Sequence, residues 1–209
     1  MIRRPPRSTP KPSSAASDVY KRQDHISQAG PWLKFRGHLD NISNNMFLGA
    51  TNAFTGGTGT GNHPVTSEKD VEINKIARSL KDDGLGWIAV GDENIGEGSS
   101  REHAAMEPRH MGGRAFIAKS YARIFEANLK KQGMLPLTFT NKDDFEKIQE
   151  KVKISISGLD ALTPGGSLTV HLKHEEGNTD EISVGHSLND QEIQWFYHGS
   201  ALNYLGSQK

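Results

Sequence analysis

The chain has 209 residues, with 25 basic side chains, 25 acidic side chains and no cysteine. This length allows one domain with a buried core, and the balanced charge provides no general basic surface for a nucleic acid or an anionic membrane. The lack of cysteine excludes a disulfide framework and any thiolate-bound metal held by this chain, and no apolar run approaches the roughly 18 residues of a membrane span.

Residues 1–23 differ in composition from the rest of the chain. They contain closely spaced prolines among basic residues, followed by serines and alanines. Such a segment buries too little apolar surface to order itself, and its prolines would break the amphipathic helix of a transit peptide. We therefore expect residues 1–23 to be a disordered, non-native segment resembling translated adapter sequence, and residues 24–209 to form the domain.

Two irregular stretches precede the first regular element. Residues 33–48 mix apolar side chains with Arg36 and several Asn and Asp residues, a density of polar groups that predicts a loop lining a site or capping its own turns. Residues 55–62 are rich in Gly and Thr, but they lack the third glycine and the preceding strand of a dinucleotide-binding loop. A flexible connector is the prediction for this tract.

Periodicity then predicts alternating helices and strands. A helix capped by Ser67 runs to about Asp83, and the continuous apolar run 87–90 predicts a strand covered on both faces. The remaining predicted elements are a helix over 101–107 ending before Pro108, a strand over 114–119, a helix over 121–132, a strand over 135–139, a helical stretch over 143–150, strands over 153–157, 167–174 and 181–186, and one amphipathic helix from Asp190 to about Leu205. The pattern predicts an α/β fold with a β-rich second half.

The segment 91–103 carries the strongest chemical signal, because a glycine-rich turn leads from a predicted strand into a predicted helix that opens on Ser99, Ser100 and Arg101. A phosphate loop would need a lysine where Glu97 stands, and neither serine has the Gly-x-Ser-x-Gly spacing of a nucleophile elbow. What remains is a hydroxyl at the positive end of a helix beside a guanidinium. Such a hydroxyl is easier to ionise, so it can act as a base.

A structural role for Ser99 fits the same letters. Ser99 and Glu102 have the spacing of a capping box, in which the serine accepts a hydrogen bond at the start of the helix and the glutamate returns one. Spacing alone leaves both interpretations open.

Three separated stretches, 35–45, 91–107 and 128–137, resemble the C-terminal swivelling domain of aconitase of the mitochondrial type. The resemblance implies a swivelling β/β/α domain, the type shared with the small subunit of isopropylmalate isomerase. It also implies aconitate hydratase activity, which isomerises citrate to isocitrate through cis-aconitate. Ser99 is then the catalytic base, and Arg36, Ser100 and Arg101 bind the tricarboxylate.

The resemblance further implies a [4Fe-4S] cluster in the complete enzyme, held by cysteines of N-terminal domains outside this chain. Those cluster-bearing domains are the expected partners, the mitochondrial matrix is the expected compartment, and the fragment alone is expected to be inactive. His38, His103 and His110 are interpreted as structural or supporting residues. His171 and His174 lie three apart on a predicted strand, which separates them onto opposite faces and argues against a shared metal.

Two alternatives stay open at the level of sequence. The small subunit of 3-isopropylmalate dehydratase stands alone and supplies the same Ser-Ser-Arg turn, which would explain the missing cysteines. A non-catalytic RNA-binding module is the other alternative, although the zero net charge and the lack of a basic aromatic stripe disfavour it.

Overall fold

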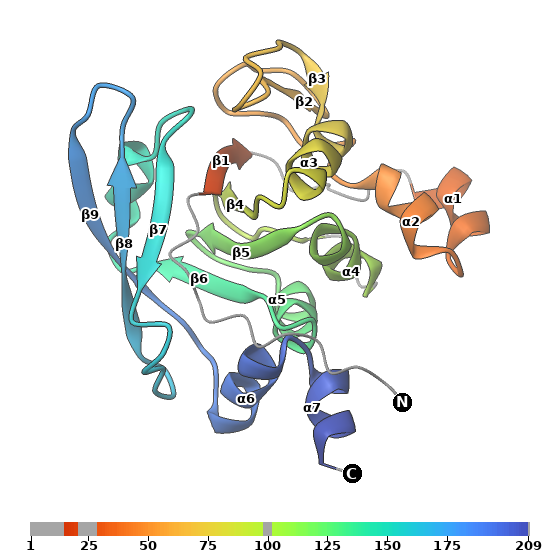
Figure 1. Cartoon of the computed structure of the whole chain (residues 1–209), viewed down its shortest axis with the longest axis vertical. Coiled ribbons are helices and arrows are strands. Elements are labelled where there is room, and N and C mark those ends of the chain that lie inside the picture. Colours follow the sequence, from red (N-terminus) through yellow and green to blue (C-terminus); the bar gives the residue numbers. More distant parts are fainter. Residues whose placement is uncertain (1–14, 21–28, 98–101, 209) are drawn as a thin grey trace.

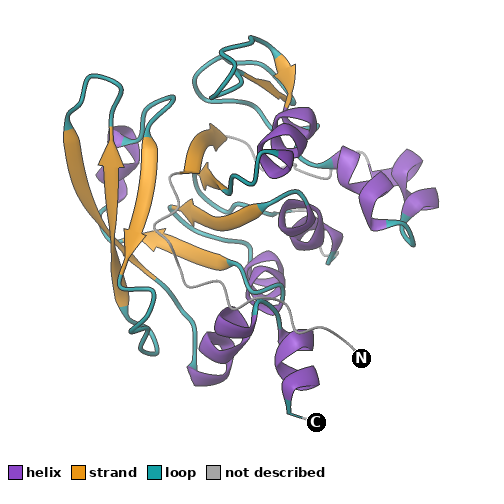
Figure 2. Cartoon of the chain, in the orientation of Figure 1, coloured by secondary structure: helices purple, strands orange, loops and turns teal. Residues whose placement is uncertain are grey.

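The centre of the fold is a group of parallel strands with helices on one side and an antiparallel sheet on the other (Figures 1 and 2). The computed structural model describes residues 15–20, 29–97 and 102–208. In chain order, the strands of the barrel are β1 (Ala15–Tyr20), β4 (Trp87–Gly91), β5 (Gly113–Ala118), β6 (Leu135–Phe139), β7 (Lys153–Ser157), β8 (Ser167–Lys173) and β9 (Thr179–Gly185).

These strands form a closed barrel in the order β1-β4-β5-β6-β9-β8-β7. The pairs β1 with β4, β4 with β5 and β5 with β6 are parallel, and the remaining pairs are antiparallel. The helices that connect the parallel strands are α3 (Ile73–Asp82), α4 (His103–His110) and α5 (Arg123–Lys131). The predicted α/β class with a β-rich second half is confirmed.

Strand periodicity divides the core in two. Ile88 and Val90 of β4 face the barrel interior, whereas Trp87 and Ala89 face the helices, because successive side chains of a strand point to opposite faces. All of β4 is buried, as its continuous apolar run predicts for a strand covered on both sides.

Residues 15–20 differ from the prediction of disorder over residues 1–23. They form β1, which pairs with β4 on one side and with β7 on the other. Composition does not reveal such a strand, because backbone hydrogen bonds to neighbouring strands hold it in the sheet, and these bonds depend little on residue type.

The predicted loop over residues 33–48 is wrong. The chain forms the short helical turns η1 (Leu33–Phe35), α2 (Leu39–Ile42) and η2 (Ser43–Asn45) there, directly after α1 (Ala29–Trp32). Polar side chains bond the local backbone: the Ser43 hydroxyl donates to the Leu39 carbonyl at 2.8 Å, and Nδ1 of His38 accepts from the Asn41 amide. Turns this short show no helical periodicity. Figure 1 shows α1 and α2 at the opposite side of the molecule from β7, β8 and β9.

The predicted helix from Ser67 begins late. Residues 60–72 form the short hairpin of β2 (Thr60–Gly61) with β3 (Val71–Glu72) and the turn between them, so α3 starts only at Ile73. Ser67 has a φ of 61°, which is incompatible with its predicted capping role at the start of a helix.

Helix α4 continues through Pro108, where the sequence predicts an end. Proline removes one backbone hydrogen bond from a helix. Glu107 and Pro108 in the last turn are themselves buried, so packing against the rest of the fold favours a helix that continues through Pro108. The predicted helix over 143–150 is a 3-10 helix, η3 (Lys142–Lys147).

The predicted C-terminal helix is two helices, α6 (Asp190–His198) and α7 (Ala201–Ser207). Gly199 has a φ of 83°, the left-handed conformation that ends helices, and the Ser200 hydroxyl accepts a hydrogen bond from the Asn203 amide to begin α7. The break turns Leu202 outward, with 79% of its surface exposed. No helix of residues 15–20, 29–97 and 102–208 has the length and apolar character to cross a membrane.

Candidate functional site

The turn that follows β4 lies at the carboxyl edge of the parallel strands, where ligands bind in sheets of this kind. Two residues of the turn have positive φ, Asn94 at 53° and Gly96 at 87°. A Cβ on Gly96 would overlap the side chain of Phe125. Gly96 is therefore required for both its backbone conformation and its close contact with α5.

The segment after β5 holds this turn in place. The Asn94 amide donates to the Ser120 hydroxyl at 2.8 Å, the Ile95 amide donates to the Ser120 carbonyl at 3.1 Å, and the Ala122 amide donates to the Ile95 carbonyl at 2.9 Å. Lys119 Nζ lies 3.0 Å from Asp92 Oδ1. The backbone leading toward the Ser99–Arg101 run is thus anchored by several independent bonds.

Three predicted site residues, Ser99, Ser100 and Arg101, lie outside the described residues. Glu102 occupies the N-cap position of α4, and α4 itself begins at His103. The capping-box alternative concerns Ser99, which lies outside the described residues.

The fourth predicted site residue, Arg36, lies against the beginning of α4. It follows η1 and is exposed, and its carbonyl oxygen is 3.0 Å from Nε2 of His103. Because a carbonyl oxygen can only accept a hydrogen bond, Nε2 of His103 carries the ring proton and donates the hydrogen bond. The fold therefore brings two of the separated sequence motifs together, with Arg36 touching the residue two positions after Arg101.

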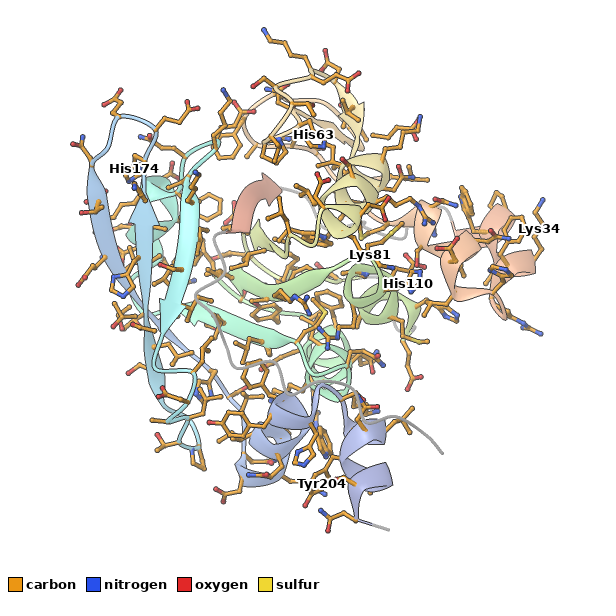
Figure 3. All side chains as sticks on the ribbon, viewed as in Figure 1. Lys34, His63, Lys81, His110, His174 and Tyr204 are labelled. Atoms are coloured by element: carbon orange, nitrogen blue, oxygen red, sulfur yellow. The ribbon has the colours of Figure 1, made fainter. Side chains whose placement is uncertain are left out.

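Asp40 connects three helices beneath this contact. Its Oδ1 accepts from Nη1 of Arg78 in α3 at 2.8 Å and lies 3.0 Å from Nε2 of His110 in α4. Hydrogen bonds from Arg78 first, and then from His110, lower the pKa of Asp40 to about 2. Figure 3 shows His110 on the side of α4 that faces α2. The Arg78 guanidinium also donates to the Asp40 carbonyl and to the Asn44 side chain.

Glu107 is a buried carboxyl group on the same helix. It is 1% exposed, and burial raises its pKa to about 8, so it is largely protonated at neutral pH. Within residues 15–20, 29–97 and 102–208, no donor or acceptor reaches its Oε1. Sequence reasoning missed Glu107, although its position between Ala104, Ala105 and Pro108 on an apolar face was the available signal.

Sequence reasoning also missed Asp40 and Ser120 as structural supports, because their partners are distant along the chain. His171 and His174 bond different carboxylates: His171 lies 3.0 Å from Glu181, and His174 lies 3.0 Å from Asp180. Across the described ranges, no group of three or more His, Asp or Glu side chains could hold a metal ion.

A comparison with protein families decides which family this architecture represents. Residues 15–142 match the aconitase C-terminal domain. The chain belongs to the aconitase C-terminal domain family. The resemblance inferred from the three motifs is therefore confirmed, and the family match begins at the first residue of β1.

Relatives within the family are longer proteins. The chain is 57% identical to the probable mitochondrial aconitate hydratase of Caenorhabditis elegans over 87% of its own length and 23% of that protein. It is 55% identical to that of Dictyostelium discoideum, over 89% of this chain and 24% of that protein. It is 51% identical to mitochondrial aconitate hydratase of Saccharomyces cerevisiae, over 87% of this chain and 23% of that protein. This chain thus spans about a quarter of the length of the curated relatives it matches.

A solved structure has the same fold. The crystal structure of 3-isopropylmalate dehydratase from Methanocaldococcus jannaschii superposes with a TM-score of 0.55 and 19% identity, over 93% of each chain. The predicted aconitase and isopropylmalate isomerase type of swivelling domain is confirmed by this match. At this identity the likeness concerns the fold alone.

Proposed function

We propose that this chain is the substrate-binding and base-donating domain of an aconitate hydratase, a hydro-lyase that interconverts citrate and isocitrate through cis-aconitate. Family membership and the names of its relatives support this function. The observation that supports it is the hydrogen bond between the Arg36 carbonyl and His103, because Arg36, the residue proposed to bind a substrate carboxylate, then lies beside the helix that follows residues 99–101.

Ser99 is the proposed base. Removing a weakly acidic proton from the carbon next to a carboxylate requires a strong base, and an alkoxide is one. An alkoxide is stabilised by the positive end of a helix and by an adjacent cation, and both α4 and Arg101 follow Ser99 in the chain.

Arg36, Ser100 and Arg101 are the proposed substrate ligands. A guanidinium group donates two parallel hydrogen bonds to one carboxylate, which fixes its orientation as well as its position. Charge accumulates on the carboxylate next to the reacting carbon as the proton leaves. Side chains that bind this carboxylate more tightly in the transition state than in the ground state accelerate the step.

The residues of this chain do not form a site for an iron-sulfur cluster. Such clusters are held by cysteine thiolates, and the sequence contains none. The aconitase family implies a [4Fe-4S] cluster in the full enzyme, and the relatives are about four times longer than the matched segment. We place the cluster and the groups that handle the departing hydroxyl in other domains of the same enzyme, which are the partners of this one.

The compartment and the domain boundary belong to the same proposal. The relatives carry the word mitochondrial in their names, which supports a mitochondrial location for this protein. Residues 24–209 are proposed as the swivelling domain, with β1 added to its barrel from the preceding segment.

Substrate choice in the complete enzyme tests this function. With the remaining domains joined to this one, we expect citrate and isocitrate to yield cis-aconitate, followed by its ultraviolet absorbance, and 3-isopropylmalate to be a poor substrate. Preferred turnover of 3-isopropylmalate would overturn the proposal in favour of the isopropylmalate dehydratase alternative.

A further inference from the structure

Helix α4 holds the segment that carries Arg36 at two points. Its first residue, His103, donates from Nε2 to the Arg36 carbonyl at 3.0 Å, and its last residue, His110, lies 3.0 Å from Oδ1 of Asp40. Seven residues of helix rise about 10 Å, so the two contacts are well separated along the helix axis. Residues 36–40 are therefore held against α4 at both ends.

The two attachments differ in strength. The Asp40 end is shared with the guanidinium of Arg78, which bonds both the carboxylate and the carbonyl of Asp40. The Arg36 end is sparsely packed: a Cβ added to Gly37 would meet no atom within 4 Å, and both Arg36 and His38 are exposed. Among residues 15–20, 29–97 and 102–208, the other backbone hydrogen bonds near Arg36 are local turn bonds, Arg36 N–H to the Leu33 carbonyl and His38 N–H to the Phe35 carbonyl, and the hydrogen bond from His103 joins this backbone to α4.

We propose that His103 is a positioning residue for Arg36. The bonded carbonyl belongs to Arg36 itself, so the hydrogen bond fixes the point from which the long, flexible guanidinium side chain extends. Fixing that point reduces the conformations that substrate binding must select, which raises affinity through preorganisation. His103 touches no substrate in this scheme. The inference rests on the proposed function, in which Arg36 binds a substrate carboxylate.

The test is a double-mutant cycle in the complete enzyme, with steady-state turnover of citrate as the measurement. Loss of one neutral hydrogen bond predicts that His103→Ala raises KM roughly five-fold, with kcat changed less than about two-fold. Arg36→Ala raises KM further. When Arg36 is absent, His103 has no guanidinium to position, so the double variant should have the KM of Arg36→Ala alone.

Conservative variants separate positioning from general support of the fold. His103→Gln places an amide donor at a similar reach and should restore KM toward the wild-type value. His103→Phe keeps an aromatic ring but removes the hydrogen-bond donor, so it should raise KM as His103→Ala does. It replaces the alanine variant if that variant does not fold. His198→Ala is the matched control, because His198 also bonds a backbone carbonyl, that of Gln194 at 2.8 Å, but on α6.

The outcomes distinguish this inference from the function beneath it. If Arg36→Ala leaves KM unchanged, the proposed substrate role of Arg36 fails. If Arg36→Ala raises KM while His103→Ala and His103→Phe do not, the positioning role is overturned. It is also overturned if the effects of the two substitutions multiply in the double variant, or if His103→Gln is as impaired as His103→Phe.

Discussion

At the scale of single residues, hydrogen bonds between distant segments build the candidate site at the carboxyl edge of the parallel strands. Arg36 and His103 are 67 positions apart in sequence, yet a direct hydrogen bond joins the first residue's backbone to the second residue's ring. Asp40 and Ser120 support the same edge through bonds to α3 and α4 and to the turn after β4. The site is therefore built from contacts between segments, which residue types alone do not reveal.

At this scale, Arg36→Lys tests the proposal that Arg36 binds a substrate carboxylate through two parallel hydrogen bonds. Lysine keeps the positive charge but replaces a planar fork with a point charge, so one of two parallel hydrogen bonds is lost. We expect KM for citrate to rise by roughly ten-fold or more, because a hydrogen bond to a charged group contributes about 1.5–3 kcal/mol. Steady-state kinetics of the complete enzyme provide the measurement, and an unchanged KM would count against bidentate binding by Arg36.

Glu107 gives the protein a pH dependence of stability that one substitution should remove. Burial raises its pKa in the folded protein to about 8 from an ordinary value of 4.5. Below pH 4.5 the group is protonated in both states. As the pH rises from 4.5 to 8 only the unfolded state loses the proton, so the free energy of unfolding falls, by an amount on the order of a few kcal/mol.

Glu107→Gln keeps the shape of the side chain without the titration. We expect this variant to be more stable than the wild type at pH 8 and close to it at pH 4.5. The measurement is denaturant unfolding of both proteins across this range, where the difference between them isolates Glu107 from other titrating groups. Parallel curves for the two proteins would show that residue 107 titrates normally.

At the scale of elements, the sequence predicts best where periodicity is long and burial is complete. The strand over 87–90 was predicted because a continuous apolar run identifies a strand covered on both faces, and the structure forms β4 there. The strand predicted over 135–139 is confirmed as β6. Helix α4 extends through Pro108 because tertiary packing outweighs one missing hydrogen bond, and α6 ends at His198 because the left-handed Gly199 follows it within an amphipathic pattern that continues to Leu205. Rules based on neighbouring residues in the sequence carry no information about tertiary packing, which decides such helix boundaries.

The candidate site shows the same division. Glycines, serines and an arginine between a strand and a helix indicate an anion site, and the structure confirms the strand that precedes residues 98–101 and the helix that follows them. Residues 33–48 were predicted as a loop because helical turns of three or four residues leave no periodic signal. The contact of Arg36 with α4 depends on those turns, so it required the structure.

For the whole molecule, the helices that connect the parallel strands and the antiparallel strands lie on different sides of the parallel strands (Figure 2). The parallel strands β4 to β6 and their helices form the edge that carries the candidate site, while β7, β8 and β9 complete the barrel on the other side. The chain matches about a quarter of each relative, which leaves room for further domains in a protein of that length. In the function proposed above, this domain contributes the base and the carboxylate ligands, and other domains contribute the cluster.

The most direct test of this division is the single-turnover rate of cis-aconitate formation in the complete enzyme at saturating citrate. With Ser99→Ala, we expect this rate to fall by roughly a thousand-fold or more, because proton removal loses its base, while citrate affinity stays within a few-fold of the wild-type value. A Ser99→Ala enzyme that forms cis-aconitate at the wild-type rate would contradict the account.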